Sequence, residues 1–299
     1  MNLYMIHYSN NLVLPHTLND IQHQVLIGGL LGDLGLTKDQ RSLFPRLKVD
    51  RQFLDNDYMN WQFNIFENLC KSPVKIFERF DVRYNKTHKY CSFRTRAVPA
   101  FLDYYNTWYP SGTKIVPEDI VFTPLILATW FCDDGCIISE KNYLTLKLST
   151  ESFGEKGAGL LSSKLESRFN CKFPIYRKQK GKDQFFIKAS TLAARAFIKD
   201  IEQYVIEFGM SRKSDKWKEH NFNPDSLISR NKILDDLILS LEDFSIKKLS
   251  GESNLSFDKV NSYIGKFLQN EYFTKYSSNE KFNLYHFKLT DSGRIFFSS

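Results

Sequence analysis

Apolar residues dominate two short stretches of the chain, and each stretch ends in an acidic residue. The first reads Leu26-Ile-Gly-Gly-Leu-Leu-Gly-Asp33 and the second Leu127-Ala-Thr-Trp-Phe-Cys-Asp-Asp134. A stretch that is apolar on every side is typical of a buried helix. Asn19-Asp20 precede the first stretch and Thr123-Pro124 precede the second, and both pairs are typical helix starts. We therefore predict two buried helices with Asp33 and Asp134 at their C-terminal ends.

Both stretches carry small residues one helical turn apart. These are Gly28 and Gly32 in the first stretch and Ala128 and Cys132 in the second. Small side chains let two helix backbones approach closely, so we expect the two helices to pack on each other through them. Such packing would bring the two carboxylates together, and two converging carboxylates bind a hard divalent cation.

Alternating apolar and polar positions follow each acidic residue and predict β-strands. In the first half we predict strands at 46–51, 75–80 and 90–96, with helices at 57–70 and 97–108. In the second half we predict strands at 143–149, 171–178 and 184–188, with helices at 152–168 and 190–206. Each half reads as αββαββα, which indicates an α+β fold with two pseudo-symmetric half-domains, 17–120 and 121–218.

Basic and polar residues occupy every second position of these strands. A period of two gives each sheet one face packed on helices and one open face. Two saddle-shaped antiparallel sheets beside the paired helices would be wide enough for a DNA duplex. The candidates for DNA contact are Arg46, Lys48, Arg94, Arg96, Lys147, Arg177, Lys178 and Lys188. Solvated sheet edges are the alternative, and we favour DNA contact for the set as a whole.

Two lysines follow the acidic residues at nearly equal intervals. Lys114 lies 81 residues after Asp33, and Lys213 lies 79 residues after Asp134. The matched spacing indicates an internal duplication and makes both lysines candidates for catalysis beside the carboxylates. A solvated surface lysine is the alternative in each case.

The composition changes after residue 218, where we place a boundary before a smaller domain at 219–299. There we predict helices at 226–243, 244–250 and 256–272, followed by strands at 273–276 and 284–289. This order resembles a winged helix. Winged helices bind DNA or act as protein-interaction modules, and both roles stay open here.

Charge and cysteine usage narrow the class of protein. The net charge of +7 favours an anionic partner such as nucleic acid. Five cysteines without a CxxC pair indicate neither a disulfide framework nor a zinc ribbon. The six histidines show no ligand spacing, which argues against a His-Cys or HNH nuclease. We expect an intracellular protein without an export signal or a membrane span.

The two acidic stretches resemble the motifs of the LAGLIDADG homing endonucleases of the single-chain, two-motif type. Gly28–Asp33 is similar to a first motif and Leu127–Gly135 to a second, while Trp108–Pro117 resembles the approach to the second motif. The resemblance covers about residues 17–218. The first motif departs from the family pattern at Leu34, where a glycine is usual.

The resemblance implies a metal-dependent double-strand break with short 3′ overhangs at a long, asymmetric site in double-stranded DNA. It implies that Asp33 and Asp134 hold two or three Mg²⁺ ions, with Mn²⁺ as a substitute, and that Lys114 and Lys213 lie beside the two cleavage sites. Asp133 is either a further ligand or contributes only its backbone carbonyl. We expect a monomer.

Two other functions stay open. Some members of the family are maturases that bind the RNA of their host intron. Some bacterial regulators join a similar core to a DNA-binding helix-turn-helix, but they typically lose the catalytic carboxylates, which this chain keeps.

Overall fold

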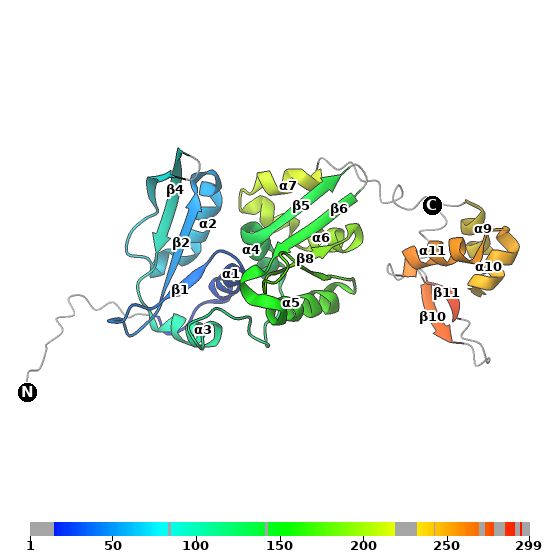
Figure 1. The fold of residues 1–299 in the computed structure, drawn as a ribbon, viewed down its shortest axis with the longest axis horizontal. Helices are drawn as coiled ribbons and strands as arrows, with labels where there is room; N and C mark the ends of the chain where they lie inside the picture. The colour runs from blue at the N-terminus through cyan, green and yellow to red at the C-terminus, as the bar shows by residue number, and fades with distance from the viewer. Residues whose placement is uncertain are drawn as a thin grey trace, which may run out of the picture. The chain divides into compact units, whose positions relative to one another are not determined.

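The computed structural model describes residues 15–82, 85–140, 143–218, 232–241, 243–268, 273–277, 285–290 and 294. The chain divides into two compact units, Met1–His220 and Asn221–Ser299 (Figure 1). None of the described helices is long and apolar enough to cross a membrane.

The first unit consists of two halves with the same order of elements. The first half contains α1 (Asp20–Leu31), β1 (Gly35–Thr37), β2 (Arg46–Gln52), α2 (Asn56–Phe66), β3 (Lys75–Asp81), β4 (Lys86–Arg94) and α3 (Leu102–Trp108). The second half contains α4 (Pro124–Asp134), β5 (Gly135–Glu140), β6 (Tyr143–Ser149), α5 (Gly154–Phe169), β7 (Ile175–Arg177), β8 (Phe185–Ala189), α6 (Thr191–Glu207) and α7 (Ser211–Lys218). Short 3-10 turns lie at Phe53–Asp55, Glu67–Leu69, Pro99–Phe101 and Glu151–Phe153.

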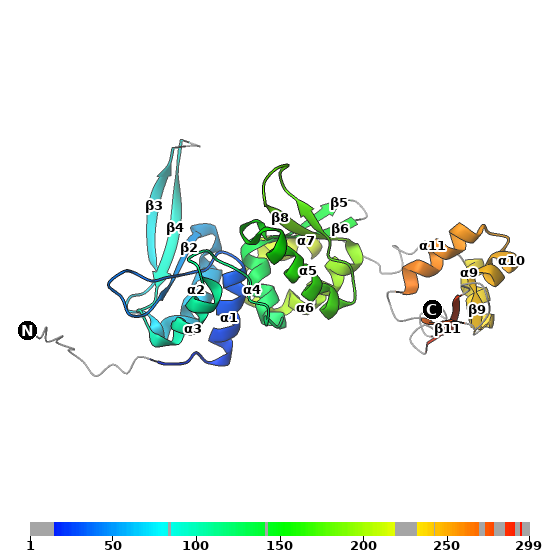
Figure 2. The same cartoon turned by 60° about the horizontal axis from the view of Figure 1, so that its bottom comes forward.

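Each half forms a four-stranded antiparallel sheet. The strand orders are β1-β2-β4-β3 and β5-β6-β8-β7, so the two sheets have one topology. The predicted duplicated α+β fold is confirmed. The prediction missed β1, which begins two residues after Asp33, and β5, which follows Asp134 directly. In Figure 2, β3 and β4 extend as a long hairpin beyond the helices of the first half.

The starts of α1 and α4 follow from local chemistry. Asn19 accepts the backbone N–H of Gln22 at 2.8 Å, and the Gln22 side chain accepts the backbone N–H of Asn19 at 3.2 Å. This reciprocal capping box satisfies two N–H groups at the start of α1. Thr123 caps α4 through the N–H of Ile126 at 3.2 Å. Both helices therefore begin where the sequence predicts.

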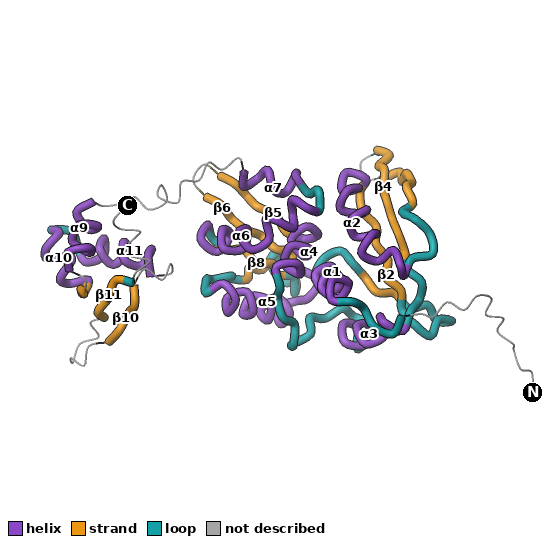
Figure 3. Tube along the Cα trace, turned by 180° about the vertical axis from the view of Figure 1, so that it is seen from behind, coloured by secondary structure: helices purple, strands orange, loops and turns teal. Residues whose placement is uncertain are grey.

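The contact between α1 and α4 lies at the centre of the first unit (Figure 3). A Cβ atom added to Gly28 would lie 2.5 Å from the Ile126 carbonyl oxygen and 2.7 Å from the Thr129 Cβ. A Cβ added to Gly32 would lie 2.3 Å from the Cβ of Asp133. Glycine is thus required at both places for the two backbones to approach this closely.

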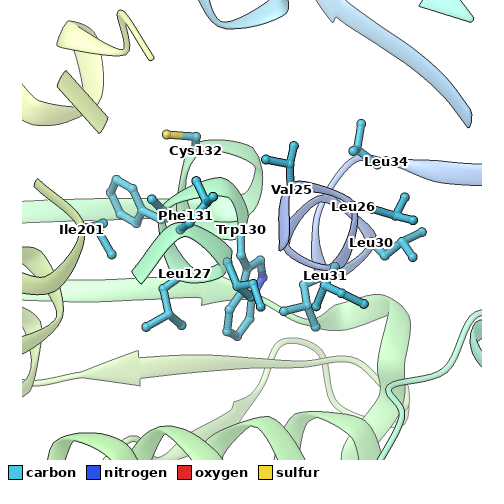
Figure 4. Close-up of a cluster of buried hydrophobic side chains, with 14 of the residues drawn as sticks. Val25, Leu26, Leu30, Leu31, Leu34, Leu127, Trp130, Phe131, Cys132 and Ile201 are labelled. Carbon is cyan, nitrogen blue, oxygen red and sulfur yellow. The ribbon is translucent and has the colours of Figure 1, made fainter. Parts of the chain in front are cut away.

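On α4 the close approach involves other residues than we expected. Ala128 and Cys132 are buried, but Gly28 and Gly32 face Ile126, Thr129 and Asp133. Figure 4 shows the Cys132 thiol turned away from α1. The position of Cys132 on the far side of the helix agrees with its electrostatic interaction with Lys213 of α7.

The second unit contains α9 (Lys232–Leu241), β9 (Asp243–Ser245), α10 (Ile246–Ser253), α11 (Phe257–Leu268), β10 (Phe273–Ser277) and β11 (Tyr285–Leu289). Its antiparallel strands follow the order β10-β11-β9. We expected a helix from residue 244, but residues 243–245 pair with β11, and α10 begins only at Ile246. The expected helical residues 226–231, 242 and 269–272 and the expected strand residue 284 lie outside the described part of the chain. The winged-helix assignment stays a prediction.

Candidate active site and nucleic-acid interface

Asp33 and Asp134 lie at matching ends of the two central helices. Asp33 follows Gly32, the C-cap of α1, and Asp134 is the last residue of α4. The side chain of Asp33 is 55% exposed. Its backbone N–H donates a hydrogen bond to Oδ2 of Asp133 at 3.2 Å, which ties the two motifs together. The packing of the helices thus brings the acidic residues of both motifs to one place.

The electrostatics of this place favour a bound cation. Burial and the charges of Asp33 and Asp133 together raise the pKa of Asp134 to about 7, while Lys114 and Lys213 oppose the shift. A carboxylate at a helix C-terminus is also disfavoured by the helix dipole. A bound cation would therefore offset the cost of a charged Asp134 carboxylate at this helix end.

Asp133 has a different environment from its neighbour. Its side chain is fully buried, and its Oδ1 accepts a hydrogen bond from Nη2 of Arg51 at 2.6 Å. Burial raises the pKa of Asp133, and the adjacent guanidinium opposes that shift. One oxygen of Asp133 thus binds Arg51 and the other binds the backbone of Asp33, so both of its oxygens already have partners within the protein.

Arg51 is the residue of the site that the sequence reasoning missed. Its side chain is 3% exposed. Nε donates to Oε1 of Gln62 at 3.0 Å, and the guanidinium carbon lies 4.5 Å from the centre of the Tyr58 ring. Burial lowers the pKa of this group, but the charges of Asp133 and Asp33 leave it above its ordinary value. A signal existed, because Arg51 occupies the same strand face as the apolar Leu47 and Val49.

Both candidate lysines reach the motif ends. Nζ of Lys114 donates to the carbonyl oxygens of Gly32 and Leu34 at 3.1 and 3.0 Å. Nζ of Lys213 donates to those of Phe131 and Gly135 at 2.9 and 2.6 Å. Burial lowers the pKa of each ammonium. Since an ammonium has three donors, each lysine keeps one for another acceptor.

The donors at this site suit a hard cation. Among the described residues there is no group of three or more His, Cys, Asp or Glu side chains that could hold a metal alone. Carboxylate oxygens are the ligands that Mg²⁺ prefers, and such ions are commonly held by one or two carboxylates together with substrate phosphates and water. Asp33 also borders an open hollow of about 310 Å³ with Arg51 and Arg79, which leaves its carboxylate accessible.

Basic residues lie opposite each other on the open faces of both sheets. In the first sheet Lys48 is paired with Arg94. In the second sheet Lys147 is paired with Lys188. Lys48 is also paired with Gly35, two residues after Asp33, and Lys147 with Cys136, two residues after Asp134. The two basic pairs therefore occupy equivalent positions in the two halves. Arg46 shares the open face of the first sheet and forms an ion pair with Asp39, whereas Lys178 follows the last residue of β7 and forms an ion pair with Glu151.

Two of the predicted DNA contacts lie elsewhere. Arg177 is paired with the buried Phe185, and its guanidinium lies 3.7 Å from the carboxylate of Glu155 on α5, so it projects toward the helices. Arg96 lies beyond the end of β4. The register adds basic residues that the prediction left out on the open face of the β3–β4 hairpin, namely Lys75, Arg79 and Lys86.

Comparison with known proteins agrees with this geometry. The model of the LAGLIDADG DNA endonuclease family matches residues 23–197, more than half of the chain. The chain belongs to this family. It is 25% identical to DNA endonuclease I-ChuI of Chlamydomonas applanata over 216 residues, which cover 68% of this chain and 99% of I-ChuI. The homing endonuclease I-WcaI bound to its DNA recognition sequence superposes with a TM-score of 0.57 and 25% identity over 63% of this chain and 83% of I-WcaI.

A maturase is among the relatives of this chain. The cytochrome b mRNA maturase bI2 of Saccharomyces cerevisiae is 25% identical over 222 residues, which are 69% of this chain. The match spans about half (51%) of that maturase. The family match ends at residue 197, so the second unit lies outside it.

Proposed function

We propose that the protein is a site-specific DNA endonuclease that makes a double-strand break with the help of divalent metal ions. One observation carries the proposal. The acidic residues Asp33 and Asp134 converge between two sheets whose open faces carry equivalent basic pairs, Lys48 with Arg94 and Lys147 with Lys188.

The paired basic residues lie against each other, although Lys48 also forms an ion pair with Asp50 and the Lys147 ammonium lies 4.5 Å from the centre of the Phe186 ring. Like charges directly opposite each other in an antiparallel pair are destabilising. Two such pairs at equivalent positions suit a polyanion with matching twofold symmetry, as the two strands of a DNA duplex provide. The saddle would then hold the duplex across both halves, with one acidic residue near each strand.

The chemistry of the site is hydrolysis of a phosphodiester. Asp33 and Asp134 would hold Mg²⁺ ions, which supply activation of a water molecule and stabilisation of the leaving oxygen. Water oxygen bonds to phosphorus, the bond to the 3′ oxygen breaks, and that oxygen gains a proton. Lys114 and Lys213 would each turn their remaining N–H donor toward the water or the negatively charged phosphate.

The proposal is tested by selection from a randomised library of long duplexes with Mg²⁺, with the cut ends sequenced. The matched control is the double variant Asp33→Asn/Asp134→Asn, which keeps the shape of both side chains. We expect paired breaks at one recurring sequence with the parent protein only. Specific capture of DNA without any cutting would refute the endonuclease.

A second function, RNA maturation, is favoured by the similarity to bI2. The protein would then bind a structured intron RNA as well as DNA. A filter-binding comparison of the RNA transcribed from the sequence around the gene with a scrambled RNA of equal length tests this. Equal affinity for both RNAs would refute it.

The second unit gives less support for DNA contact than its element order suggested. Residues 221–299 contain ten Lys and Arg and ten Asp and Glu, so the net charge of +7 arises entirely from the first 220 residues. We therefore assign DNA contact to the two sheets. Binding of DNA or of a protein by the second unit stays a prediction.

A further inference from the structure

A stacked pair of aromatic side chains lies on the open face of each sheet. In the first sheet Phe77 of β3 is paired with Tyr90 of β4, and in the second sheet Tyr176 of β7 is paired with Phe186 of β8. The ring centres of the two pairs lie 5.9 and 5.8 Å apart, at interplanar angles of 19° and 22°. Since successive side chains of a strand alternate between faces, these rings share the open faces with the basic pairs.

The rings are partly open to water and each pair lies beside a cation. Tyr176 is 46% exposed. The guanidinium of Arg79 lies 5.2 Å from the centre of the Tyr90 ring, and Nζ of Lys147 lies 4.5 Å from the centre of the Phe186 ring. Because the rings of each pair stack across neighbouring strands, their edges point away from the sheet. Each open face therefore presents an apolar ridge next to a positive charge.

The two aromatic pairs lie at different steps of the strand ladders. Arg94 and Lys188 occupy equivalent positions, because they pair with equivalent lysines. Tyr90 lies four residues before Arg94 on β4, whereas Phe186 lies only two residues before Lys188 on β8. The aromatic pair of the first half is thus one two-residue step farther from the basic pair.

A polar pair with one lysine occupies the other step in each half. In the first half Lys75 is paired with Ser92, between the basic and the aromatic pair. In the second half the backbone N–H of Lys178 donates to the carbonyl oxygen of Gln184 at 2.8 Å, one step beyond the aromatic pair. The order of the polar and aromatic pairs is therefore inverted between the halves, which breaks the pseudo-twofold symmetry that the basic pairs keep.

An apolar ridge on a basic face suits one feature of a DNA duplex. In the major groove the apolar group that a base presents is the 5-methyl group of thymine. Two residues of a strand span about 6.8 Å, which equals the rise of about two base pairs of B-DNA. An aromatic pair that is displaced by one step would therefore meet a different base pair.

We propose that the two aromatic pairs are specificity-determining residues that contact thymine methyl groups in the major groove, one pair in each half of the target. The thymine contacted by the first sheet lies about two base pairs farther from the centre of the target than the thymine contacted by the second sheet. The inference rests on the duplex binding of the proposed function and not on cleavage. Contact with one methyl group contributes about fourfold to affinity.

The test compares thymine with uracil, which lacks only the 5-methyl group. A target duplex is selected from the randomised library by binding to the full-length protein in EDTA, and each thymine is then replaced in turn by uracil. In a gel shift we expect two replacements, one in each half of the target, each to weaken binding about fourfold.

Two double variants assign each thymine to its sheet. Phe77→Lys/Tyr90→Gln gives the first sheet the residues that the second carries at that step, and it should remove the uracil effect in one half of the target. Tyr176→Lys/Phe186→Ser does the same for the second sheet and should remove the effect in the other half. Phe80→Ser is the matched control, because Phe80 is 55% exposed on the opposite face of β3, and it should leave both effects unchanged.

A quadruple variant tests the displacement between the halves. Lys75→Tyr/Ser92→Phe/Phe77→Lys/Tyr90→Gln gives the first sheet the order of pairs that the second sheet already carries. A new selection with this variant should return targets in which the two methyl-dependent thymines lie about two base pairs closer together.

The converse exchange in the second sheet serves if the first exchange unfolds the protein. Tyr176→Lys/Phe186→Ser/Lys178→Phe/Gln184→Tyr should move the two thymines about two base pairs farther apart. An unchanged spacing in a folded exchange variant would overturn the inference.

Equal binding of thymine and uracil duplexes by the parent protein would overturn the inference as well, and so would a uracil effect that persists in the double variants or disappears in Phe80→Ser. Cleavage of the target without any methyl dependence would leave the endonuclease standing and refute this inference alone. Methyl dependence, removed by the double variants, in a duplex that the protein binds but never cuts with Mg²⁺ would refute the endonuclease and support the reading of thymine.

Discussion

Replacement of Asp134 by Asn should stabilise the metal-free protein, and more so at high pH. In the folded protein Asp134 has a pKa of about 7, compared with an ordinary value of 3.8. Since the folded state holds this proton more tightly than the unfolded state, the contribution of Asp134 to stability falls as the pH rises from about 4 to about 7. Above pH 7 the charged carboxylate is confined at the end of α4, next to Asp33 and Asp133.

The pKa difference sets an upper limit of about 4 kcal/mol for this effect. Asp134 is partly open to water, which screens its charge, so we expect a gain of about 1–2 kcal/mol for Asp134→Asn at pH 8.5 and less than half of that at pH 5. Urea unfolding in EDTA at both pH values measures the free energy of unfolding directly.

Glu118→Gln serves as the control for this measurement. The Glu118 side chain is 81% exposed and lies 3.8 Å from Lys156, so its replacement should change the free energy of unfolding by less than about 0.5 kcal/mol at either pH. The reasoning is refuted if Asp134→Asn destabilises the protein at pH 8.5, or if its effect does not grow between pH 5 and pH 8.5.

Three further predictions concern DNA. Asp33→Asn or Asp134→Asn alone should abolish double-strand cleavage of a plasmid target while a gel-shift assay still shows binding; cleavage at the parent rate would contradict the assignment of the acids. Lys48→Ala/Arg94→Ala should weaken binding and reduce the slope of log affinity against log salt by about 2, whereas Arg177→Ala, on the helix side of its sheet, should leave that slope unchanged; equal effects would argue against the open-face assignment. Deleting residues 226–299 should weaken or redirect DNA binding, which a footprint would show, but should keep metal-dependent cutting. Loss of cutting in a folded truncation would show that the second unit contributes to the chemistry.

The sequence predicted the elements whose causes are local. The starts of α1 and α4 follow from the caps at Asn19 and Thr123, and the burial of both helices follows from their continuous apolar stretches. The strands β1 and β5 escaped prediction because they lie close after a helix end and are defined by pairing with a later strand. Asp243–Ser245 escaped for the same reason, since pairing with β11 overrides its local preference.

The sequence predicted the site residues that have a counterpart in both halves, and it missed the ion pair that occurs only once. Asp33 and Asp134 stand out because the two motifs repeat, and Lys114 and Lys213 because their intervals match. Arg51 and Asp133 have no counterpart of the same type in the other half, and their ion pair depends on how the two halves pack. The alternation along each strand would have placed both Arg51 and Arg177 in the apolar phase, away from the open face. Arg51 has a buried partner there in Asp133, whereas Arg177 reaches the exposed Glu155.

The most direct test of the endonuclease is cleavage of a selected target duplex labelled on both strands. The parent protein and Asp33→Asn/Asp134→Asn would be compared at equal binding, with Mg²⁺ and with EDTA. The account predicts that the parent cuts both strands only with Mg²⁺ and that the double variant binds the duplex without cutting either strand. Cutting by the double variant, or cutting by the parent in EDTA, would contradict it.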